Sequence, residues 1–359
     1  MILSSPSAFG LDLSDLSIKL ALLKKQKKNF TLASWSRLDI PQGIIEEGKI
    51  KQEESLINII REVSENTQGD KLRSKYCVVS LPETESYVRV IQLPHVNQEE
   101  IGEAIKWELE ANIPVSVNDV YFDWQIIEEA SSPQNHTDIL IGALPKNLID
   151  PYLEVIKKAG LKPLAFEIES VAIARALIKE SEWSEPVLIA DLGAKHTVFI
   201  IYAGGAIWFT CSAPISNSLL IGDIAKILKI SYEDAKSMKL NVGLDLFEEG
   251  GKIFRAMEPR LIELASEIKK YLEYYRINLA PNHPQSPQIN RILLCGGGAN
   301  LKGLAGFLSS ELKVKVSVGN PWVNILRPET KELPGLSFPE SLAFTTALGL
   351  ALRGFSENQ

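Results

Sequence analysis

The sequence predicts an α/β protein built from two lobes, and three phrases of the chain lead to this expectation. A strand, a turn and a second strand are expected at residues 9–20, and the pattern recurs at 188–199, each time with an Asp at the end of the first strand. A third phrase, residues 292–304, is an apolar strand that enters a helix through three consecutive glycines. Helical and strand-like periodicities alternate along the rest of the chain, as they do in α/β proteins.

The repeated hairpins also suggest a ligand. A tight turn exposes consecutive backbone N–H groups that can surround phosphate oxygens. A carboxylate beside the turn, here Asp12 or Asp191, can hold Mg²⁺ through water, because this ion keeps much of its hydration shell. A single Asp at a strand end is more often a turn former. Its repetition, followed by the glycines, favours ATP and Mg²⁺ bound between two lobes, as in the actin, Hsp70 and sugar-kinase fold.

Composition excludes several other classes. A length of 359 residues favours two domains, and a net charge of −7 argues against nucleic acid as the main partner. Cys77, Cys211 and Cys295 lie far apart, without the spacing of a disulfide framework or a zinc site, so we interpret them as core thiols. Residues 1–7 lack the pattern of a secretory signal, and residues 342–352 are too short an apolar run to span a bilayer. We therefore expect a cytoplasmic protein without a membrane anchor of its own.

The first half of the chain is expected to form strands at 30–40, 76–81, 86–93, 119–128, 139–144 and 164–168, and helices at 53–65, 98–111 and 148–159. The helix at 53–65 is predicted because Leu56, Ile60 and Val63 share one side at helical spacing. Pro82 ends the strand at 76–81, and Gly160 ends the helix at 148–159.

The second half is expected to contain helices at 218–228, from Ser231 onward, and at 257–279. Ser231 with Asp234 resembles a capping box. The closing helix, 341–354, is expected to return to the first lobe. The predicted domains are a first lobe of residues 1–75, 165–185 and 338–359, an inserted module of residues 76–164, and a second lobe of residues 186–337.

Several motifs together resemble the PilM family of type IV pilus assembly proteins, relatives of the division protein FtsA. They are residues 10–12 with 17–19, 104–110 followed by Ile113-Pro114, 121–125, 191–194, 267–275, 296–301, 320–321 and 347–354. The Trp-Glu, Ile-Pro and Asp-Trp-Gln motifs of the inserted module discriminate best, since general actin-like ATPases lack them.

The resemblance implies an ATP-binding scaffold beneath the inner membrane that grips the N-terminal cytoplasmic tail of a bitopic, PilN-like protein. Other pilus assembly components are possible further partners. The inserted module would correspond to the 1C subdomain of the family, and its junction with the first lobe would form the peptide groove. The protein would be held peripherally at the inner membrane through this partner.

The expected nucleotide site draws on all three phrases. Asp12 and Asp191 would face the metal or its waters. Ser17, Lys19, Gly193, Ala194 and Thr197 would lie at the phosphates, and Gly296, Gly297, Gly298 and Asn300 at the nucleoside. Glu233 and Lys236 would flank the base by analogy with actin-like folds, although an exposed i, i+3 pair is an equal alternative. Lys19 could equally be a solvated strand residue, and we expect Trp107 and Trp124 to belong to the core of the module.

Two departures from the family pattern bear on affinity. Ser14 and Asp15 stand where the family often has glycine, and a carboxylate there would repel phosphate unless it points away or meets the metal. Residues 214–217 replace a pair of glycines.

Hydrolysis of the nucleotide is a separate question. No acidic residue stands in a sequence context that demands a role as general base, so we expect at most slow ATP hydrolysis. An actin-like ATPase or small-molecule kinase and an FtsA-like polymerising protein remain the alternative functions.

Overall fold

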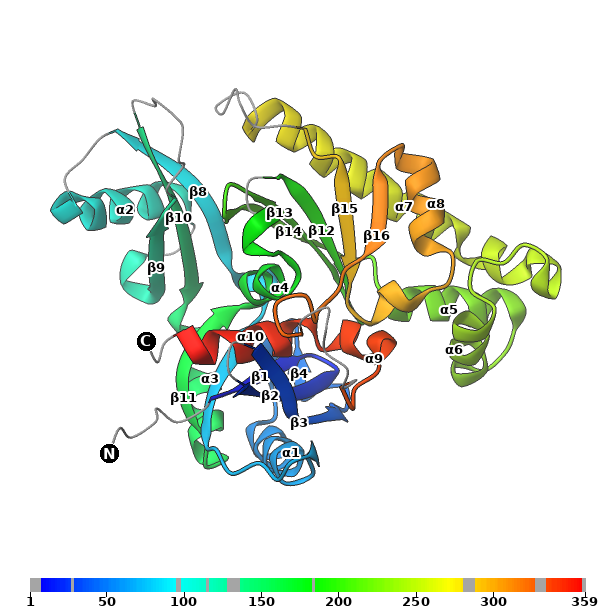
Figure 1. Ribbon diagram of the computed structural model, residues 1–359, viewed down its shortest axis with the longest axis horizontal. Coiled ribbons are helices and arrows are strands. Elements are labelled where there is room, and N and C mark those ends of the chain that lie inside the picture. The colour runs from blue at the N-terminus through cyan, green and yellow to red at the C-terminus, as the bar shows by residue number, and fades with distance from the viewer. Residues whose placement is uncertain are drawn as a thin grey trace.

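The computed structural model describes residues 8–26, 29–94, 98–113, 116–127, 136–182, 185–279, 288–326 and 334–356 (Figure 1). Its strands form a six-stranded sheet, an eight-stranded sheet and the two-stranded ribbon β4 (Ile45–Glu46) and β5 (Lys49–Ile50). The two large sheets form the cores of two lobes, as the sequence predicts. Pro114 of the Ile-Pro motif and residue 128, the expected end of a strand, lie outside the described residues.

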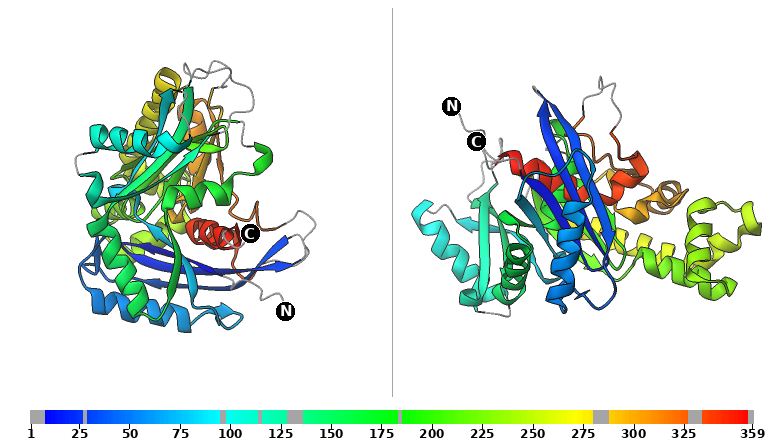
Figure 2. Two further views of the ribbon diagram at one scale, coloured as in Figure 1. Left: turned by 90° about the vertical axis from the view of Figure 1, so that its left-hand side faces the viewer. Right: turned by 90° about the horizontal axis from the view of Figure 1, so that it is seen from below.

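The first lobe is built on the six-stranded sheet, in the order β11-β7-β1-β2-β3-β6. These strands are β1 (Phe9–Ser14), β2 (Ser17–Gln26), β3 (Asn29–Asp39), β6 (Gln68–Gly69), β7 (Tyr76–Leu81) and β11 (Lys162–Ile168). Helix α10 (Thr345–Ser356) covers one face and α1 (Glu53–Glu65) the other (Figure 2). Helices α3 (Lys146–Lys158), which packs beside α1, and α4 (Glu169–Leu177), which packs against α10, complete the lobe.

The closing helix does return to the first lobe, but it is two helices rather than one. Helix α9 (Phe338–Ala343) begins at a capping box made by Ser337 and Glu340, and α10 begins after Phe344. Helix α10 lies directly on β1. The approach is so close that a Cβ at Gly10 would be only 2.0 Å from the Ala347 carbonyl oxygen. Glycine at position 10 therefore allows the helix to approach the strand at backbone distance.

The second lobe is built on the eight-stranded sheet, in the order β16-β15-β12-β13-β14-β8-β10-β9. Its strands are β8 (Tyr87–Pro94), β9 (Val120–Ile126), β10 (His136–Pro145), β12 (Val187–Leu192), β13 (Thr197–Ala203), β14 (Ala206–Ala213), β15 (Arg291–Cys295) and β16 (Lys315–Val318). The helices of this half are α5 (Asn217–Leu228), α6 (Tyr232–Asn241), α7 (Lys252–Tyr274) and α8 (Leu304–Leu312). The Ser231 hydroxyl caps α6 through the backbone N–H of Asp234, as expected.

The strands of the predicted inserted module, residues 76–164, are divided between the two large sheets. Strands β7 and β11 pair with β1 and with each other in the first-lobe sheet, and α3 packs against α1. The remaining strands β8, β9 and β10 form an antiparallel sheet, which joins the second lobe where Arg89 of β8 pairs with Phe209 of β14. Strand pairing therefore favours an inserted module of residues 87–145 over 76–164.

Helix α2 (Gln98–Asn112) covers this module sheet and corrects one prediction. Ile101, Ile105 and Leu109 recur every four residues and are buried against the sheet. Trp107 lies two residues from both Ile105 and Leu109, so it faces away, and 72% of it is exposed. Trp107 is therefore not a core residue, whereas Trp124 of β9 is half-buried against the same cluster.

Candidate functional site

A cavity of about 860 Å³ lies between the lobes, and all three phrases of the sequence line it. The turns of the two hairpins and the glycine segment after β15 form much of its wall. The first residues of two helices, Glu169 of α4 and Thr345 of α10, complete it. Its volume lies within the range of small-molecule sites.

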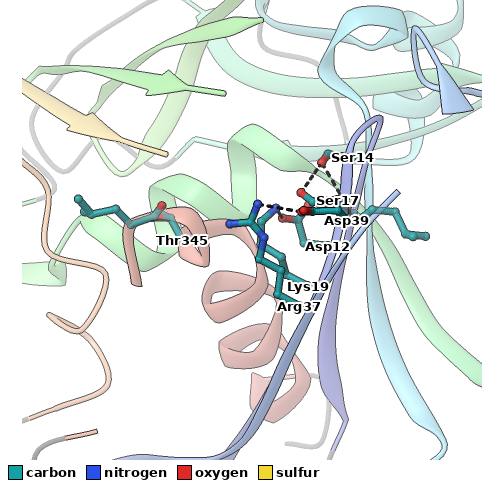
Figure 3. Close-up of polar contacts among 10 residues, drawn as sticks. Asp12, Ser14, Ser17, Lys19, Arg37, Asp39 and Thr345 are labelled. Carbon is teal, nitrogen blue, oxygen red and sulfur yellow. Dashed lines mark hydrogen bonds and ion pairs between the residues drawn. The ribbon is translucent and has the colours of Figure 1, made fainter. Parts of the chain in front are cut away.

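The first hairpin and the neighbouring strand β3 carry a row of charged side chains. Asp12 on β1 lies opposite Lys19 on β2, which lies opposite Arg37 on β3. Because directly opposed residues of antiparallel strands project from the same face, the Lys19 ammonium meets the Asp12 carboxylate at 2.8 Å. Figure 3 shows this row, with Thr345 at the start of α10 across from it. Lys19 is buried and ion-paired, so the alternative of a solvated strand residue is wrong.

The turn of the first hairpin is closed by hydroxyl groups. The Ser14 hydroxyl donates to the Ser17 carbonyl oxygen at 3.0 Å, and the two hydroxyl oxygens lie 3.1 Å apart. Asp15, between them, accepts hydrogen bonds from the backbone N–H groups of Glu47 and Gly48, both at 3.0 Å. Lys195 of the second hairpin pairs with it at 2.9 Å. The negative charge of Asp15 is thus offset by one cation and two N–H dipoles, which reduces the repulsion expected from the sequence.

The second hairpin holds its aspartate differently. Asp191 on β12 lies opposite Val198 on β13, so it has no cation across the strand. The Cys295 thiol donates to its carboxylate at 3.5 Å. Burial raises the pKa of Asp191 to about 6, and the negative charge of Asp12 adds to this effect, while the Cys295 hydrogen bond and the Lys19 charge oppose it. A proton can therefore exchange at Asp191 near neutral pH.

The glycine segment, residues 296–298, packs its backbone directly against Asp191 and Leu192. A Cβ at Gly296, whose φ is +77°, would lie 2.3 Å from Asp191 Oδ1, and one at Gly298 would lie 2.7 Å from the Leu192 Cβ. At Gly297 the nearest atom to such a Cβ would be 3.9 Å away. The first and third glycines therefore serve packing, and the middle one leaves open space at the cavity.

The structure brings together most of the predicted site residues. Those that line the cavity are Asp12, Ser17, Lys19, Asp191, Gly193, Ala194, Lys236, Gly296, Gly297, Gly298 and Asn300. Thr197 does not line it, because its buried hydroxyl donates to the Ile215 carbonyl oxygen at 2.6 Å. Glu233 is also outside the lining and forms an exposed pair with Lys236 at 3.6 Å. We therefore withdraw the ligand contacts assigned to Thr197 and Glu233.

Sequence reasoning missed an acidic residue in the cavity wall. Glu169 is the first residue of α4, and its pKa is raised well above the ordinary value by burial and by the negative charges of Asp12, Asp191 and Glu83. Acidic residues are common in the first turn of any helix, so its place in the chain carried no distinguishing signal. Asn217, another missed residue, lines the cavity, and its buried side-chain oxygen has no hydrogen-bond partner among the described residues.

The donor groups fit a hydrated magnesium better than a directly coordinated metal. Within the described ranges, no three His, Cys, Asp or Glu side chains gather in a metal-binding arrangement. Mg²⁺ usually keeps several waters and uses one or two carboxylates together with phosphate oxygens. Asp12 and Asp191, which interact electrostatically across the cavity, supply carboxylates of this kind.

Comparison with known proteins gives the fold and the family. The model of the family "Type IV pilus assembly protein PilM" matches residues 10–355. The cell division protein FtsA of Escherichia coli K12 is 23% identical over 229 residues, which are 58% of this chain and 51% of FtsA. FtsA of Neisseria meningitidis serogroup B is 23% identical over 282 residues, 71% of this chain and 66% of that protein. The chain thus spans about half the length of the Escherichia coli relative.

Solved structures agree with this assignment. A PilM-PilN type IV pilus biogenesis complex matches with a TM-score of 0.78 and 26% identity over 97% of this chain and 98% of that chain. MreB5 of Spiroplasma citri bound to ADP matches with a TM-score of 0.56 and 13% identity over 98% and 96% of the two chains. The predicted two-lobed, actin-like fold is confirmed. No helix in the described part of the chain has both the length and the low polarity needed to cross a bilayer. With nearly its whole length matched by the family model, the chain belongs to the PilM family of type IV pilus assembly proteins.

Proposed function

We propose that this protein is a nucleotide-binding scaffold of type IV pilus assembly, which holds ATP with Mg²⁺ between its lobes and binds the cytoplasmic N-terminal segment of a PilN-like membrane protein. The cavity between two aspartate hairpins is the observation that carries the nucleotide half of this proposal. MreB5, which shares the fold, has been solved with ADP and with AMPPNP. The complex of PilM with PilN supports the partner half.

Each part of the cavity wall would serve one part of the nucleotide. Lys19 and the hairpin backbones would meet the phosphates, and Gly297 would let the backbone approach the nucleoside. Asp12 and Asp191 would orient the waters around Mg²⁺, which itself would neutralise phosphate charge. The unpartnered oxygen of Asn217 would gain a hydrogen bond from a ligand or from one of its waters.

Calorimetry with purified protein tests the nucleotide site. We expect ATP to bind in the presence of Mg²⁺ and the Asp191→Ala variant to bind about tenfold more weakly, a loss of about 1.4 kcal/mol. Glu233→Ala is the matched control, because it also removes a carboxylate but lies outside the cavity lining. Equal affinities of wild type and Asp191→Ala would remove this residue from the site, and absence of binding to wild type would refute the site itself.

The partner segment is assigned to the junction of the module with the first lobe. Strand β9 is an edge of the eight-stranded sheet, so its outer backbone groups can pair with an added strand. Tyr121 of β9 is 46% exposed, and its hydroxyl donates to Asp150 of α3 at 3.1 Å. Lys146 of α3 lies over the same ring, 5.3 Å from its centre. Tyr121 thus contacts the first lobe, and it offers an aromatic anchor beside a strand edge that no strand among the described residues covers.

Point variants test this assignment better than a deletion, because removing residues 76–164 would take β7 and the first three residues of β11 from the first-lobe sheet. We expect Tyr121→Ala to weaken binding of a labelled PilN-like N-terminal peptide about tenfold in a fluorescence titration, as removal of an aromatic anchor does. Leu246→Ala, an exposed apolar site in the second lobe, is the control. A peptide that responds only to changes in the second lobe would show that the receptor is elsewhere.

Slow hydrolysis of the bound nucleotide is a second candidate function, favoured by Glu169. Glu169 lines the cavity, and burial raises its pKa, which makes its ionised form a stronger base toward a proton of water. We expect turnover well below about one per second, the lower range of typical enzymes, and loss of that turnover in Glu169→Gln with binding retained. Turnover that persists in Glu169→Gln would exclude this residue as the base, and a wild-type rate above one per second would favour an enzyme over a scaffold.

A further inference from the structure

An ion pair joins the turns of the two hairpins in the wall of the cavity. Asp15 lies in the turn of the first hairpin and Lys195 in the turn of the second, 180 positions along the chain. The Lys195 ammonium is 2.9 Å from Asp15 Oδ2, and the two side chains are 32% and 14% exposed. Both residues line the cavity, so the contact connects the lobes at the place where phosphates would lie.

Asp15 is anchored independently of this contact. The backbone N–H groups of Glu47 and Gly48, in the turn between β4 and β5, donate to its two carboxylate oxygens at 3.0 Å. That turn is held in its place by the buried Tyr152 hydroxyl, which donates to the Gly48 carbonyl oxygen at 2.8 Å. Release of Lys195 would therefore leave Asp15 in position with two hydrogen bonds.

Lys195 is the more exposed partner of this ion pair. Asp15 is the partner that the structure gives its ammonium group, and about a third of the side chain is exposed. Lys19, by contrast, is 10% exposed and held by Asp12 within the sheet row. Of these two lysines, Lys195 can change partners at the smaller cost, because less of it must be rehydrated or repacked.

We propose that Lys195 is an exchangeable latch, which holds the lobes together through Asp15 and, when a nucleoside triphosphate binds, transfers to its terminal phosphate. A triphosphate offers a stronger anionic partner at the hairpin turns than a diphosphate does, so Lys195 would favour ATP over ADP. The contact between the lobes is argued from the ion pair alone. The transfer rests on the nucleotide site proposed above.

The first test measures the distance between the lobes without nucleotide. Spin labels at Glu62→Cys and Glu311→Cys, both exposed, report this distance by pulsed electron paramagnetic resonance. A Cys211→Ser background avoids the half-buried native thiol. We expect Asp15→Asn and Lys195→Met each to lengthen and broaden the distribution. Asp223→Asn is the matched control, because it breaks a pair with Arg260 at 2.9 Å and of similar exposure, which lies within the second lobe and outside the cavity lining. A distribution unchanged by Asp15→Asn and Lys195→Met would overturn the latch.

The second test compares ATP and ADP affinities by calorimetry. Loss of a charged hydrogen bond costs about tenfold in affinity or more, so Lys195→Met should bind ATP about tenfold more weakly and ADP nearly as wild type does. Asp15→Asn should bind ATP more tightly than wild type does, because Lys195 no longer forms an ion pair with a carboxylate at position 15. Equal losses for both nucleotides would overturn the transfer. Absence of any nucleotide binding to wild type would refute the proposed site, while the distance measurement would still decide the latch.

Discussion

In the first hairpin Asp12 lies opposite Lys19, whereas in the second hairpin Asp191 lies opposite Val198. The first aspartate therefore belongs to a buried ion pair with an N–O distance of 2.8 Å. The second has a thiol at 3.5 Å as its side-chain partner and a pKa raised to about 6. Two phrases with the same pattern in the sequence thus hold their carboxylates in opposite electrostatic environments.

The difference follows from one position in each hairpin, the residue across from the aspartate. A lysine there pairs with the carboxylate, and the opposite charge offsets the loss of hydration. A valine leaves the burial cost uncompensated, so the proton binds more tightly. We infer that the first hairpin contributes a buried ion pair to the fold and the second a carboxylate whose charge depends on pH and ligand.

The largest expected effect comes from breaking the pair in the first hairpin. Asp12→Ala leaves the Lys19 ammonium buried without its partner, which should lower the free energy of unfolding by about 4 kcal/mol. Asp191→Ala should cost little stability, because it removes a charge that is already poorly solvated. Chemical denaturation measures both. Adding Lys19→Met to Asp12→Ala should recover much of the loss, and a double variant as unstable as the single one would contradict this explanation.

A second difference between the hairpins is the residue that stands two positions before the aspartate. Gly10 stands two residues before Asp12, where the second hairpin has the buried Ile189 before Asp191. Gly10→Ala would place a Cβ 2.0 Å from the Ala347 carbonyl oxygen of α10 and should lower the free energy of unfolding by about 3 kcal/mol.

Gly222→Ala is the control for this variant, because Gly222 lies within α5 and a Cβ there would meet nothing within 4 Å. Alanine should stabilise that helix by up to about 1 kcal/mol. A Gly10→Ala protein as stable as wild type in thermal unfolding would mean that α10 can shift away from β1.

The smallest expected effect is the pH dependence of the second hairpin. The folded-state pKa of Asp191, about 6, exceeds its ordinary value of 3.8, so the folded state binds more protons between these values and stability falls as pH rises through them. Mg²⁺-dependent nucleotide affinity should change in the opposite direction, because the metal requires the ionised carboxylate.

Lowering the pH from about 7.5 to about 5.5 should weaken the Mg²⁺-dependent part of nucleotide affinity about fourfold, since about a quarter of Asp191 would remain ionised. Calorimetry at both pH values measures this change. Asp191→Asn should show a flatter profile, and a wild-type profile with the same slope as that of the variant would assign the titration to another group.

Much of the fold follows from local patterns. The spacing of Leu56, Ile60 and Val63 predicts α1, and Ser231 predicts the start of α6, because side-chain periodicity and capping act within one or two turns. The outward position of Trp107 was also readable from the spacing of Ile101, Ile105 and Leu109, although we expected it in the core. The family resemblance came from contiguous motifs, and the family match confirms it.

Most residues that we expected at the cavity do line it, and the errors arise where a contact joins segments that are distant in the sequence. The two-residue turn between Ser14 and Ser17 sets the register that places Lys19 opposite Asp12. The position of Thr197 was misjudged, because the direction of its hydroxyl is set by the Ile215 carbonyl oxygen, 18 residues away. Glu169 enters the cavity because β11 pairs with β7 and directs the start of α4 there.

The sequence by itself determined the two aspartate hairpins, the glycine segment, most helices and strands and the family, because each depends on neighbours along the chain. Tertiary structure alone decided that Asp15 meets Lys195, that Glu169 joins the two aspartates, and that β7 and β11 belong to the first lobe. These relations depend on which strands pair and how the lobes close. Such contacts join residues up to 180 positions apart, and no local pattern encodes their distance or their charge.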